Sequence, residues 1–210
     1  MNQSSIKEII KYAIIVIALI NISACENARD CHNDVNCMIT NNRKIRVDAC
    51  DTSGERRRNA KVDIGYDSYN IKRNYYGYTN NNRQLVYVEA ENLILQTKQE
   101  ERHGNRLCNG QADVKGTELK NYDKGHVIAD ALGGVSNAYN ITPEHSYVNR
   151  KGVQYQLERY LFNQLQNNHQ VTNVKVIISY PDDKTQIPNK YDFSWEIDEQ
   201  QQQQVSFENK

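Results

Sequence analysis

The stretch NYDKGHVIADALGGVSNAYNITPEHSYVNRKGVQYQLERY, residues 121–160, carries the most specific pattern in this chain. It opens on a polar block, Asp123–His126, and continues into a short apolar run that two adjacent glycines stop. The periodicity then changes, because apolar residues recur every four positions at Val153, Leu157, Leu161 and Leu165. This recurrence predicts one face of a helix over residues 152–167.

Runs that are typical of strands flank this stretch on both sides. Leu85–Val88 and Leu93–Leu95 precede it, and Val174–Ile178 and Tyr191–Ile197 follow it. Strands, one well-formed helix and further strands predict a single α+β domain of about residues 70–198. Residues 199–210 form a Gln-rich, low-complexity end that we expect to be a frayed tail.

The side chains in this stretch suit one kind of chemistry. Hydrolysis of a phosphodiester needs a base for the attacking water and stabilisation of charge on the phosphate and the departing oxygen. The imidazole of His126 suits the first task. Mg²⁺ suits the second, since it is a hard cation that prefers oxygen ligands and keeps several waters. The side-chain oxygen of an asparagine is a suitable neutral ligand for such an ion.

The order of these residues resembles the non-specific DNA/RNA endonuclease family of the ββα-metal fold. The signature of that family is an Asp-Arg-Gly-His block, an Asn-Ile/Leu-x-Pro block, and a metal-binding Asn that leads into a helix carrying Glu. Asp123–His126, Asn140–Pro143 and Asn149 match it. The segments 126–134 and 187–198 resemble the branch of secreted bacterial DNases and type VII secretion nuclease toxins. The resemblance is strong over 120–165, weaker over 75–119 and 170–198, and absent before 70.

The resemblance implies a ββα-metal nuclease fold, with an antiparallel sheet and one long catalytic helix. It also implies a role for each matching residue. His126 would be the general base, Asn149 the direct ligand of Mg²⁺ (or of Mn²⁺ as a substitute), and Glu158 would orient metal-bound water. Asp123 would sit beside the histidine and organise its loop, and Asn140 would help to hold the site together.

Two positions depart from the family pattern. Lys124 replaces the commoner Arg and keeps the charge but not the bidentate geometry; we expect it, with Arg150, to contact phosphate. Asn149 and Glu158 are nine residues apart, where the family usually has eight. Nine steps of about 100° place two side chains on opposite faces of one helix. Both can face one metal only if the helix begins after Asn149 or the chain breaks near Gly152.

The first 25 residues predict export. An n-region with Lys7 and Lys11 precedes the apolar run Tyr12–Ile20, which is shorter than the about 20 residues that span a bilayer. The run ends in Ile22-Ser23-Ala24-Cys25, which resembles a bacterial lipobox. We therefore expect residues 1–24 to be a lipoprotein signal peptide and Cys25 to be lipidated, with passage to the outer membrane. An ordinary signal peptide with a chance cysteine is the alternative.

Residues 25–69 are polar and lack sustained periodicity, which predicts a tether. Its run Arg56–Arg58 reads as a solvated charge cluster or, alternatively, as a phosphate contact. Beyond Cys25 the chain has four cysteines, Cys31, Cys37, Cys50 and Cys108. In an exported chain these predict two disulfides with three possible pairings. A zinc site is the alternative, and the absence of a close Cys-x-x-Cys pair argues against it.

The charge balance bounds the function. With 26 basic and 26 acidic residues, any affinity for nucleic acid must come from local arrangement. The sequence predicts a Mg²⁺-dependent, largely sequence-nonspecific endonuclease of DNA, with RNA as an open second substrate. Its predicted partners are nucleic acid and, through Cys25, a membrane of the bacterial envelope; no protein partner is predicted. The alternatives are a non-catalytic nucleic-acid-binding lipoprotein and a nuclease toxin delivered to other cells, although a tethered enzyme cannot easily travel.

Overall fold

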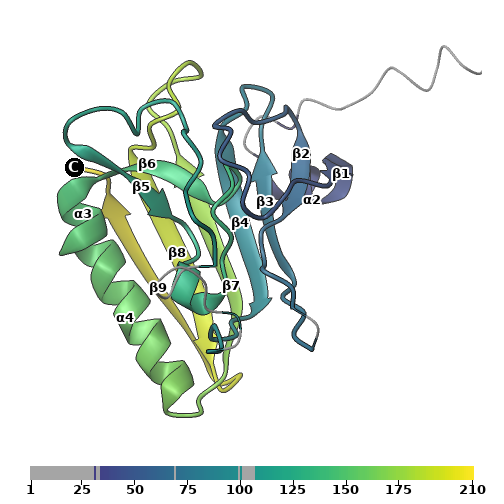
Figure 1. Cartoon of the computed structure of the whole chain (residues 1–210), viewed down its shortest axis with the longest axis vertical. Helices are drawn as coiled ribbons and strands as arrows, with labels where there is room; N and C mark the ends of the chain where they lie inside the picture. Colours follow the sequence, from purple (N-terminus) through teal and green to yellow (C-terminus); the bar gives the residue numbers. More distant parts are fainter. Residues whose placement is uncertain (1–30, 32–33, 69, 99, 101–106) are drawn as a thin grey trace, which may run out of the picture.

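A computed structural model describes residues 31, 34–68, 70–98, 100 and 107–210 (Figure 1). The predicted signal peptide and Cys25 lie outside these described residues. Within the described part of the chain, no helix has both the length and the apolar character needed to cross a membrane.

A seven-stranded sheet forms one layer of the molecule. Its strands, in spatial order, are β1 (Arg43–Ile45), β2 (Ala60–Asp63), β3 (Tyr75–Thr79), β4 (Leu85–Asn92), β7 (Val171–Ser179), β8 (Lys190–Ile197) and β9 (Gln201–Glu208). Every neighbouring pair is antiparallel except β1 and β2, which are parallel. The predicted α+β class is therefore confirmed. Leu85–Val88 lies in β4 as predicted, whereas Leu93–Leu95 follows the end of β4 and is not a strand, so that prediction is wrong.

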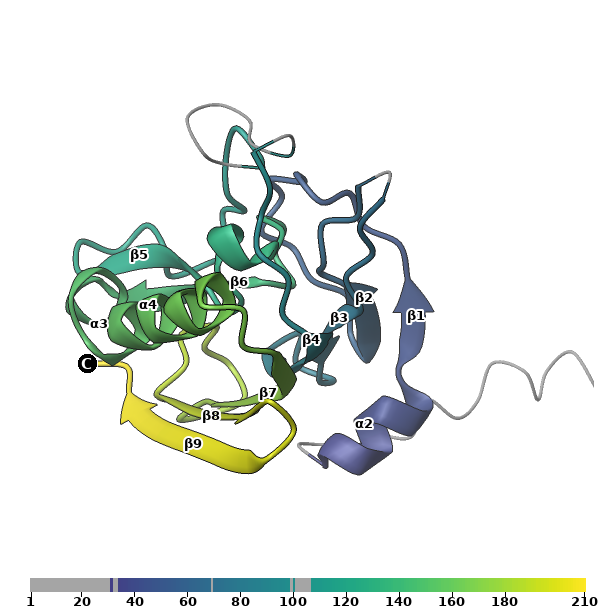
Figure 2. The same ribbon diagram turned by 90° about the horizontal axis from the view of Figure 1, so that it is seen from below.

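A second layer lies on one face of this sheet (Figures 1 and 2). It consists of the two-stranded sheet β5 (Tyr122–His126) and β6 (Ile141–His145), followed by α3 (Ser146–Arg150) and α4 (Val153–Gln166). The long connection between β5 and β6 contains the short 3-10 helix η1 (Asp130–Leu132).

Alternating apolar residues hold the two layers together. In β7, Val174, Val176 and Ile178 are buried and the two residues between them are exposed. Leu157 and Leu161 of α4 belong to the same core. Each fully buried side chain of this size stabilises the fold by about 1.5–3 kcal/mol. The buried apolar face of α4 is shorter than predicted, because Val153 at the start of the helix is 39% exposed.

The segment predicted to be a tether is part of the fold. Its described residues form α2 (Val35–Asn41), β1 and β2, and β2 pairs with β3 along the large sheet. Met38 of α2 packs against Tyr78 and Tyr87 on the sheet face opposite to α4. The tether prediction is therefore wrong for residues 34–68. These elements are too short to show a period in the sequence.

Arg56 is also not a solvated residue. Only 4% of it is exposed. Its guanidinium donates from Nε to the carbonyl oxygen of Ala138 (2.6 Å), from Nη2 to that of Ile141 (2.7 Å) and from Nη1 to Oε1 of Gln186 (2.9 Å). Burial of a charged group is tolerated where its donors are satisfied, and here the donors fasten the N-terminal segment to the start of β6. Arg57 and Arg58 are exposed as predicted.

The Gln-rich end is ordered as well. β9 pairs with β8 over eight residue pairs, and the ring of Phe207 stacks on that of Tyr191 with centroids 5.3 Å apart. Beyond the strand, buried Asn209 donates to the carbonyl oxygens of Pro143 (3.0 Å) and Pro188 (2.8 Å), and its Oδ1 accepts from the backbone of His145 (2.7 Å). The prediction of a frayed tail is therefore wrong. It relied on the Gln-rich composition and did not consider the apolar Phe207, which packs against Tyr191.

The four described cysteines form two disulfides, Cys31–Cys37 and Cys50–Cys108. This confirms the expected number of bridges, selects one of the three pairings and leaves no thiolate for zinc. The second bridge spans 58 residues, and closing a loop of that size typically contributes about 2–4 kcal/mol.

Candidate active site

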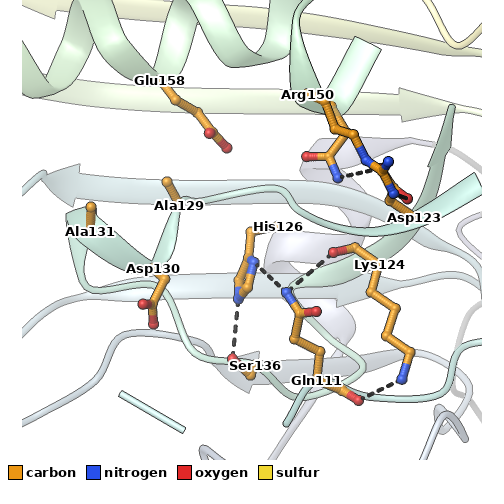
Figure 3. Close-up of a pocket in the computed structure, with 11 residues that line it drawn as sticks. Gln111, Asp123, Lys124, His126, Ala129, Asp130, Ala131, Ser136, Arg150 and Glu158 are labelled. Atoms are coloured by element: carbon orange, nitrogen blue, oxygen red, sulfur yellow. Dashed lines mark hydrogen bonds and ion pairs between the residues drawn. The ribbon is translucent and has the colours of Figure 1, made fainter. Parts of the chain in front are cut away.

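A cleft of about 600 Å³ opens between β5, the loop after it, α3 and α4 (Figure 3). Its lining includes six residues singled out in the sequence: Asp123, Lys124, His126, Asn149, Arg150 and Glu158. They come from three elements, since the first three lie on β5, the next two on α3 and the last on α4. The structure therefore brings the predicted site residues together, with Asn140 as the exception.

Asn140 lies beneath the cleft and is fully buried. Its Oδ1 accepts from the backbone N–H of Ile128 (2.9 Å), and its Nδ2 donates to the carbonyl oxygens of Ile128 and Val135 (2.8 Å each). One side chain thus satisfies three buried backbone groups of the loop that follows His126. This placement gives Asn140 a structural contribution to the loop rather than a contact with substrate.

Gly125 lets β5 lie close to a buried carboxyl group. A Cβ atom at this position would come within 2.6 Å of Oε2 of Glu144, the residue that pairs with Asp123 on β6. A glycine is therefore needed between Lys124 and His126 as long as Glu144 is present.

The helical structure is interrupted between the two elements that carry Asn149 and Glu158. α3 ends at Arg150, and α4 begins at Val153 after Gly152. A Cβ on Gly152 would come within 2.8 Å of the Cα of Val148, so the close approach of the two helices requires a glycine. An interruption near Gly152 is one of the two arrangements that the sequence left open. It brings Asn149 and Glu158 to the same cleft although nine residues separate them.

Arg150 and Lys124 contact acidic side chains of the protein. Arg150 binds Asp123 in a bidentate pair, from Nε to Oδ2 (2.7 Å) and from Nη2 to Oδ1 (2.6 Å). Burial raises the pKa of Asp123, but the hydrogen bonds from Arg150, Ser146 and Asn149 outweigh it, and the net shift is downward. Lys124 contacts Asp113 and donates to the carbonyl oxygen of Gln111 (3.2 Å). Both cations still line the cleft.

Glu158 is half-buried on α4. Desolvation raises the pKa of its carboxyl to about 7, although a hydrogen bond from Gln154 acts in the opposite direction. Gln154 Nε2 donates to Glu158 Oε1 and to the carbonyl oxygen of His126, both at 3.2 Å. This amide links the helix to the end of β5 and fixes the position of Glu158 relative to His126.

The donor set fits a mostly hydrated Mg²⁺. Among the described residues no group of three or more His, Cys, Asp and Glu could hold a metal, so a cage of protein ligands is not available there. Nδ2 of Asn149 donates to Asp123 Oδ2 (3.3 Å), which fixes the amide and identifies its other end as the oxygen. Mg²⁺ usually binds one or two protein oxygens and keeps its remaining waters. Asn149 Oδ1 and the carboxylate of Glu158 match that requirement, and a nearby cation would favour the ionised form of Glu158.

Glu144 was not singled out in the sequence. Only 2% of it is exposed, and its Oε2 has no hydrogen-bond partner in the structure. Burial, with further contributions from the charges of Glu158 and Asp123, raises its pKa well above the ordinary value and so favours the protonated carboxyl. A carboxyl residue within a strand gives no sequence signal of this state.

We expect Glu144→Gln to flatten the pH dependence of stability. A raised pKa in the folded state means that Glu144 stabilises the fold fully below its unfolded pKa, and that this contribution is lost as the pH rises above it. Wild-type protein should lose up to about 1.4 kcal/mol per pH unit through this group above pH 5. Urea denaturation in EDTA at pH 5–8 measures the slope. Glu199→Gln, at an exposed position, is the control, and equal slopes for wild type and Glu144→Gln would contradict the prediction.

Two more residues near the site were not predicted, Gln111 and Ser136. Both line the cleft, and each contacts one ring nitrogen of His126. Glutamine and serine are common in polar loops, so nothing in the sequence distinguishes them.

Comparisons with known proteins agree with this geometry. Residues 66–199 match the DNA/RNA non-specific endonuclease family. The chain is 27% identical over 123 residues to the type VII secretion system protein EssD of Staphylococcus aureus strains USA300 and NCTC 8325. The match covers 57% of this chain but only 19% of EssD, so the chain spans about a fifth of that relative.

Among solved structures, NucA from Streptococcus agalactiae with a magnesium ion bound has a similar fold. The TM-score is 0.52 at 17% sequence identity, over 69% of this chain and 76% of NucA. This likeness confirms the predicted ββα-metal nuclease architecture. The family match covers most of the chain and includes every residue of the cleft. The chain therefore belongs to the DNA/RNA non-specific endonuclease family.

Proposed function

We propose that this protein is a Mg²⁺-dependent endonuclease that hydrolyses phosphodiester bonds of DNA with little regard to sequence. The observation that supports this most is the convergence of His126, Asn149 and Glu158 from three elements on one cleft. Their side chains supply a base, a neutral oxygen ligand and a carboxylate. The phosphodiester group is the same at every step of the nucleic acid, so contacts to it carry no sequence information.

Each residue has a distinct task in this proposal. His126 takes the proton from the attacking water. Asn149 would hold Mg²⁺ directly and Glu158 would hold it through water, and the bound ion would stabilise negative charge on the phosphate and the departing oxygen. Asp123 keeps the Asn149 amide and the Arg150 guanidinium in place through its two carboxylate oxygens. The cations of Arg150 and Lys124 attract the phosphate backbone into the cleft.

The test is cleavage of a supercoiled plasmid by the purified, oxidised chain, with Mg²⁺, with Mn²⁺ or with EDTA. The proposal expects nicked and then linear DNA with either metal and intact DNA with EDTA. A parallel assay with a structured RNA decides whether RNA is a second substrate. Binding of DNA without cleavage under all conditions would instead support a non-catalytic binding protein.

Asn149→Ala is expected to raise the Mg²⁺ concentration needed for half-maximal cleavage by at least about 10-fold, because the direct protein ligand is lost. Titration of plasmid nicking against Mg²⁺ measures this. Asn149→Asp keeps a ligand oxygen but loses the hydrogen bond to Asp123 Oδ2 and places a second carboxylate beside it, so it should recover only part of the metal response. An unchanged titration curve for Asn149→Ala would remove this residue from the metal site.

The proposal also places the enzyme outside the cytoplasm, anchored through lipidated Cys25 after removal of residues 1–24. The two disulfides support it, because such bridges persist in oxidising compartments. Cys25→Ser should prevent lipidation, and fractionation of cells should then move the protein from the membrane pellet to the soluble fraction. Pelleting of the variant with the membranes to the same extent as wild type would contradict the anchor.

A further inference from the structure

The two ring nitrogens of His126 contact different side chains (Figure 3). Nδ1 lies 3.2 Å from Nε2 of Gln111, and Nε2 lies 3.1 Å from Oγ of Ser136. A neutral imidazole has one N–H and one lone pair, so these contacts bear on which nitrogen can accept a proton.

The orientation of the Gln111 amide can be established from a second contact. Its Nε2 also lies 3.3 Å from the carbonyl oxygen of Lys124, and a carbonyl oxygen only accepts hydrogen bonds. The end of the amide that faces β5 is therefore the NH₂ group, since the reversed amide would place two oxygens against each other. The backbone carbonyl of Gln111 in turn accepts from Lys124 Nζ (3.2 Å), which ties the residue to β5 on a second side. Hence Gln111 donates, and His126 Nδ1 accepts.

Ser136 is the complementary acceptor. With the lone pair on Nδ1, the ring proton is on Nε2 and is donated to Ser136 Oγ. Only 4% of Ser136 is exposed. Its backbone is held on both sides, since its N–H donates to the carbonyl oxygen of Ala49 (3.1 Å) and its carbonyl accepts from Ala112 N–H (2.9 Å). The main chain of Ser136 is therefore held beside the ring, and its buried hydroxyl contacts His126 Nε2.

We propose that Ser136 and Gln111 are positioning residues that hold His126 as the Nε2–H tautomer, so that Nδ1 is the nitrogen that accepts the proton of the attacking water. The assignment of Nδ1 as the proton acceptor rests on the proposed function, whereas the assignment of the tautomer rests on the hydrogen-bond geometry alone. A water must take the place of the Gln111 N–H at Nδ1, which exchanges one ordinary neutral hydrogen bond for another. Ser136 keeps its bond throughout, because Nε2–H persists in the imidazolium.

The water proton moves to Nδ1, the water oxygen forms a bond to phosphorus, and the phosphorus bond to the leaving ester oxygen breaks. The leaving oxygen takes a proton from solvent, and His126 later returns its proton to solvent. No oxidant or reductant is needed.

The first test observes the tautomer directly and needs neither metal nor substrate. Two-bond ¹H–¹⁵N correlation spectra of the ¹⁵N-labelled full chain separate Nε2–H from Nδ1–H rings, and the spectrum of His126→Ala identifies the signals of this ring. The proposal expects the Nε2–H pattern in wild type and a mixture of tautomers in Ser136→Ala. An Nδ1–H pattern in wild type would overturn it. An Nε2–H pattern in a chain that does not cleave DNA would instead count against the proposed function alone.

The second test is kinetic. Ser136→Ala should lower kcat for plasmid nicking by about 3- to 10-fold with little change in KM, because one hydrogen bond that aligns the base is lost. Ser136→Thr, which keeps the hydroxyl, should restore most of it. Unchanged kcat in Ser136→Ala would overturn the positioning role.

Gln111→Glu provides a variant at a half-buried position that does not depend on the folding of Ser136→Ala. A carboxylate can only accept, so it should draw the ring proton to Nδ1, reverse the tautomer in the spectrum and lower kcat by at least about 10-fold. Gln166→Glu makes the same charge change at the exposed end of α4 and should leave kcat as in wild type. Retention of the wild-type spectrum and rate by Gln111→Glu would overturn the assignment.

Discussion

Replacement of His126 by alanine is expected to lower kcat for plasmid nicking by at least about 10²-fold, the smaller end of the effect of removing a general base. The imidazole lines the cleft and makes its contacts with polar side chains, so the loss is one of chemistry rather than of core packing. Steady-state cleavage in saturating Mg²⁺ gives kcat, and circular dichroism with thermal unfolding verifies that the variant is folded.

His169→Ala is the matched control for the loss of a histidine. His169 lies on the surface, where its Nδ1 contacts Asp198 Oδ2 (2.7 Å), and it is not among the residues that line the cleft. Its removal should leave kcat within about twofold of wild type, because the side chain does not line the cleft and an exposed polar contact contributes little to stability. Full activity of folded His126→Ala would show that the base is another group.

Arg73→Met is expected to lower the free energy of unfolding by about 3–5 kcal/mol, the cost of leaving one partner of a buried ion pair alone. Arg73 is fully buried and binds Glu100 through Nη1–Oε1 (2.8 Å) and Nη2–Oε2 (3.1 Å). Its other donors reach the carbonyl oxygens of Tyr66, Ile94 and Leu95. Domains are stable by only about 5–15 kcal/mol, so this single change removes a large part of the total. Urea denaturation under oxidising conditions measures it.

Arg83→Met separates burial from charge in this experiment. Arg83 also pairs with a glutamate, Glu55 (3.2 Å), but its side chain is 52% exposed. We expect a change below about 1 kcal/mol there. Similar losses of stability in Arg73→Met and Arg83→Met would contradict the role of burial.

The buried pair also predicts acid sensitivity, because the hydrogen bonds from Arg73 lower the pKa of Glu100 from 4.5 to about 2. A lowered pKa stabilises the fold above the unfolded value and ceases to do so as the pH falls through this interval.

The cleft could be predicted from the sequence because its residues are local. His126, Asn149 and Glu158 lie within 33 residues, and the four-residue period of α4 is visible without tertiary information. The nine-residue separation indicated that, for both side chains to face one metal, the helix must begin after Asn149 or be interrupted near Gly152, since one continuous helix would place them on opposite faces. These features depend on sequence order and helix geometry alone.

The remainder depends on tertiary contacts. β1 and β2 have three and four residues, too few for a period. They are strands because β2 pairs with the edge of β3 and β1 pairs in turn with β2. A run of three arginines does not show that Arg56 is buried, because that depends on carbonyl groups more than 80 positions away. Gln111 could not be identified as a neighbour of His126 for the same reason. Its role depends on how the chain returns to β5.

The break between α3 and α4 affects how this chain can change in length. One residue gained or lost in the connection at 151–152 alters the spacing of Asn149 and Glu158 without rotating either helix about its own axis. One residue inserted between Val153 and Glu158 would instead turn the carboxylate by about 100° around α4 and away from the cleft. A change of length in the connection therefore keeps the angular position of Glu158 counted from the start of α4, whereas a change of length within the helix does not.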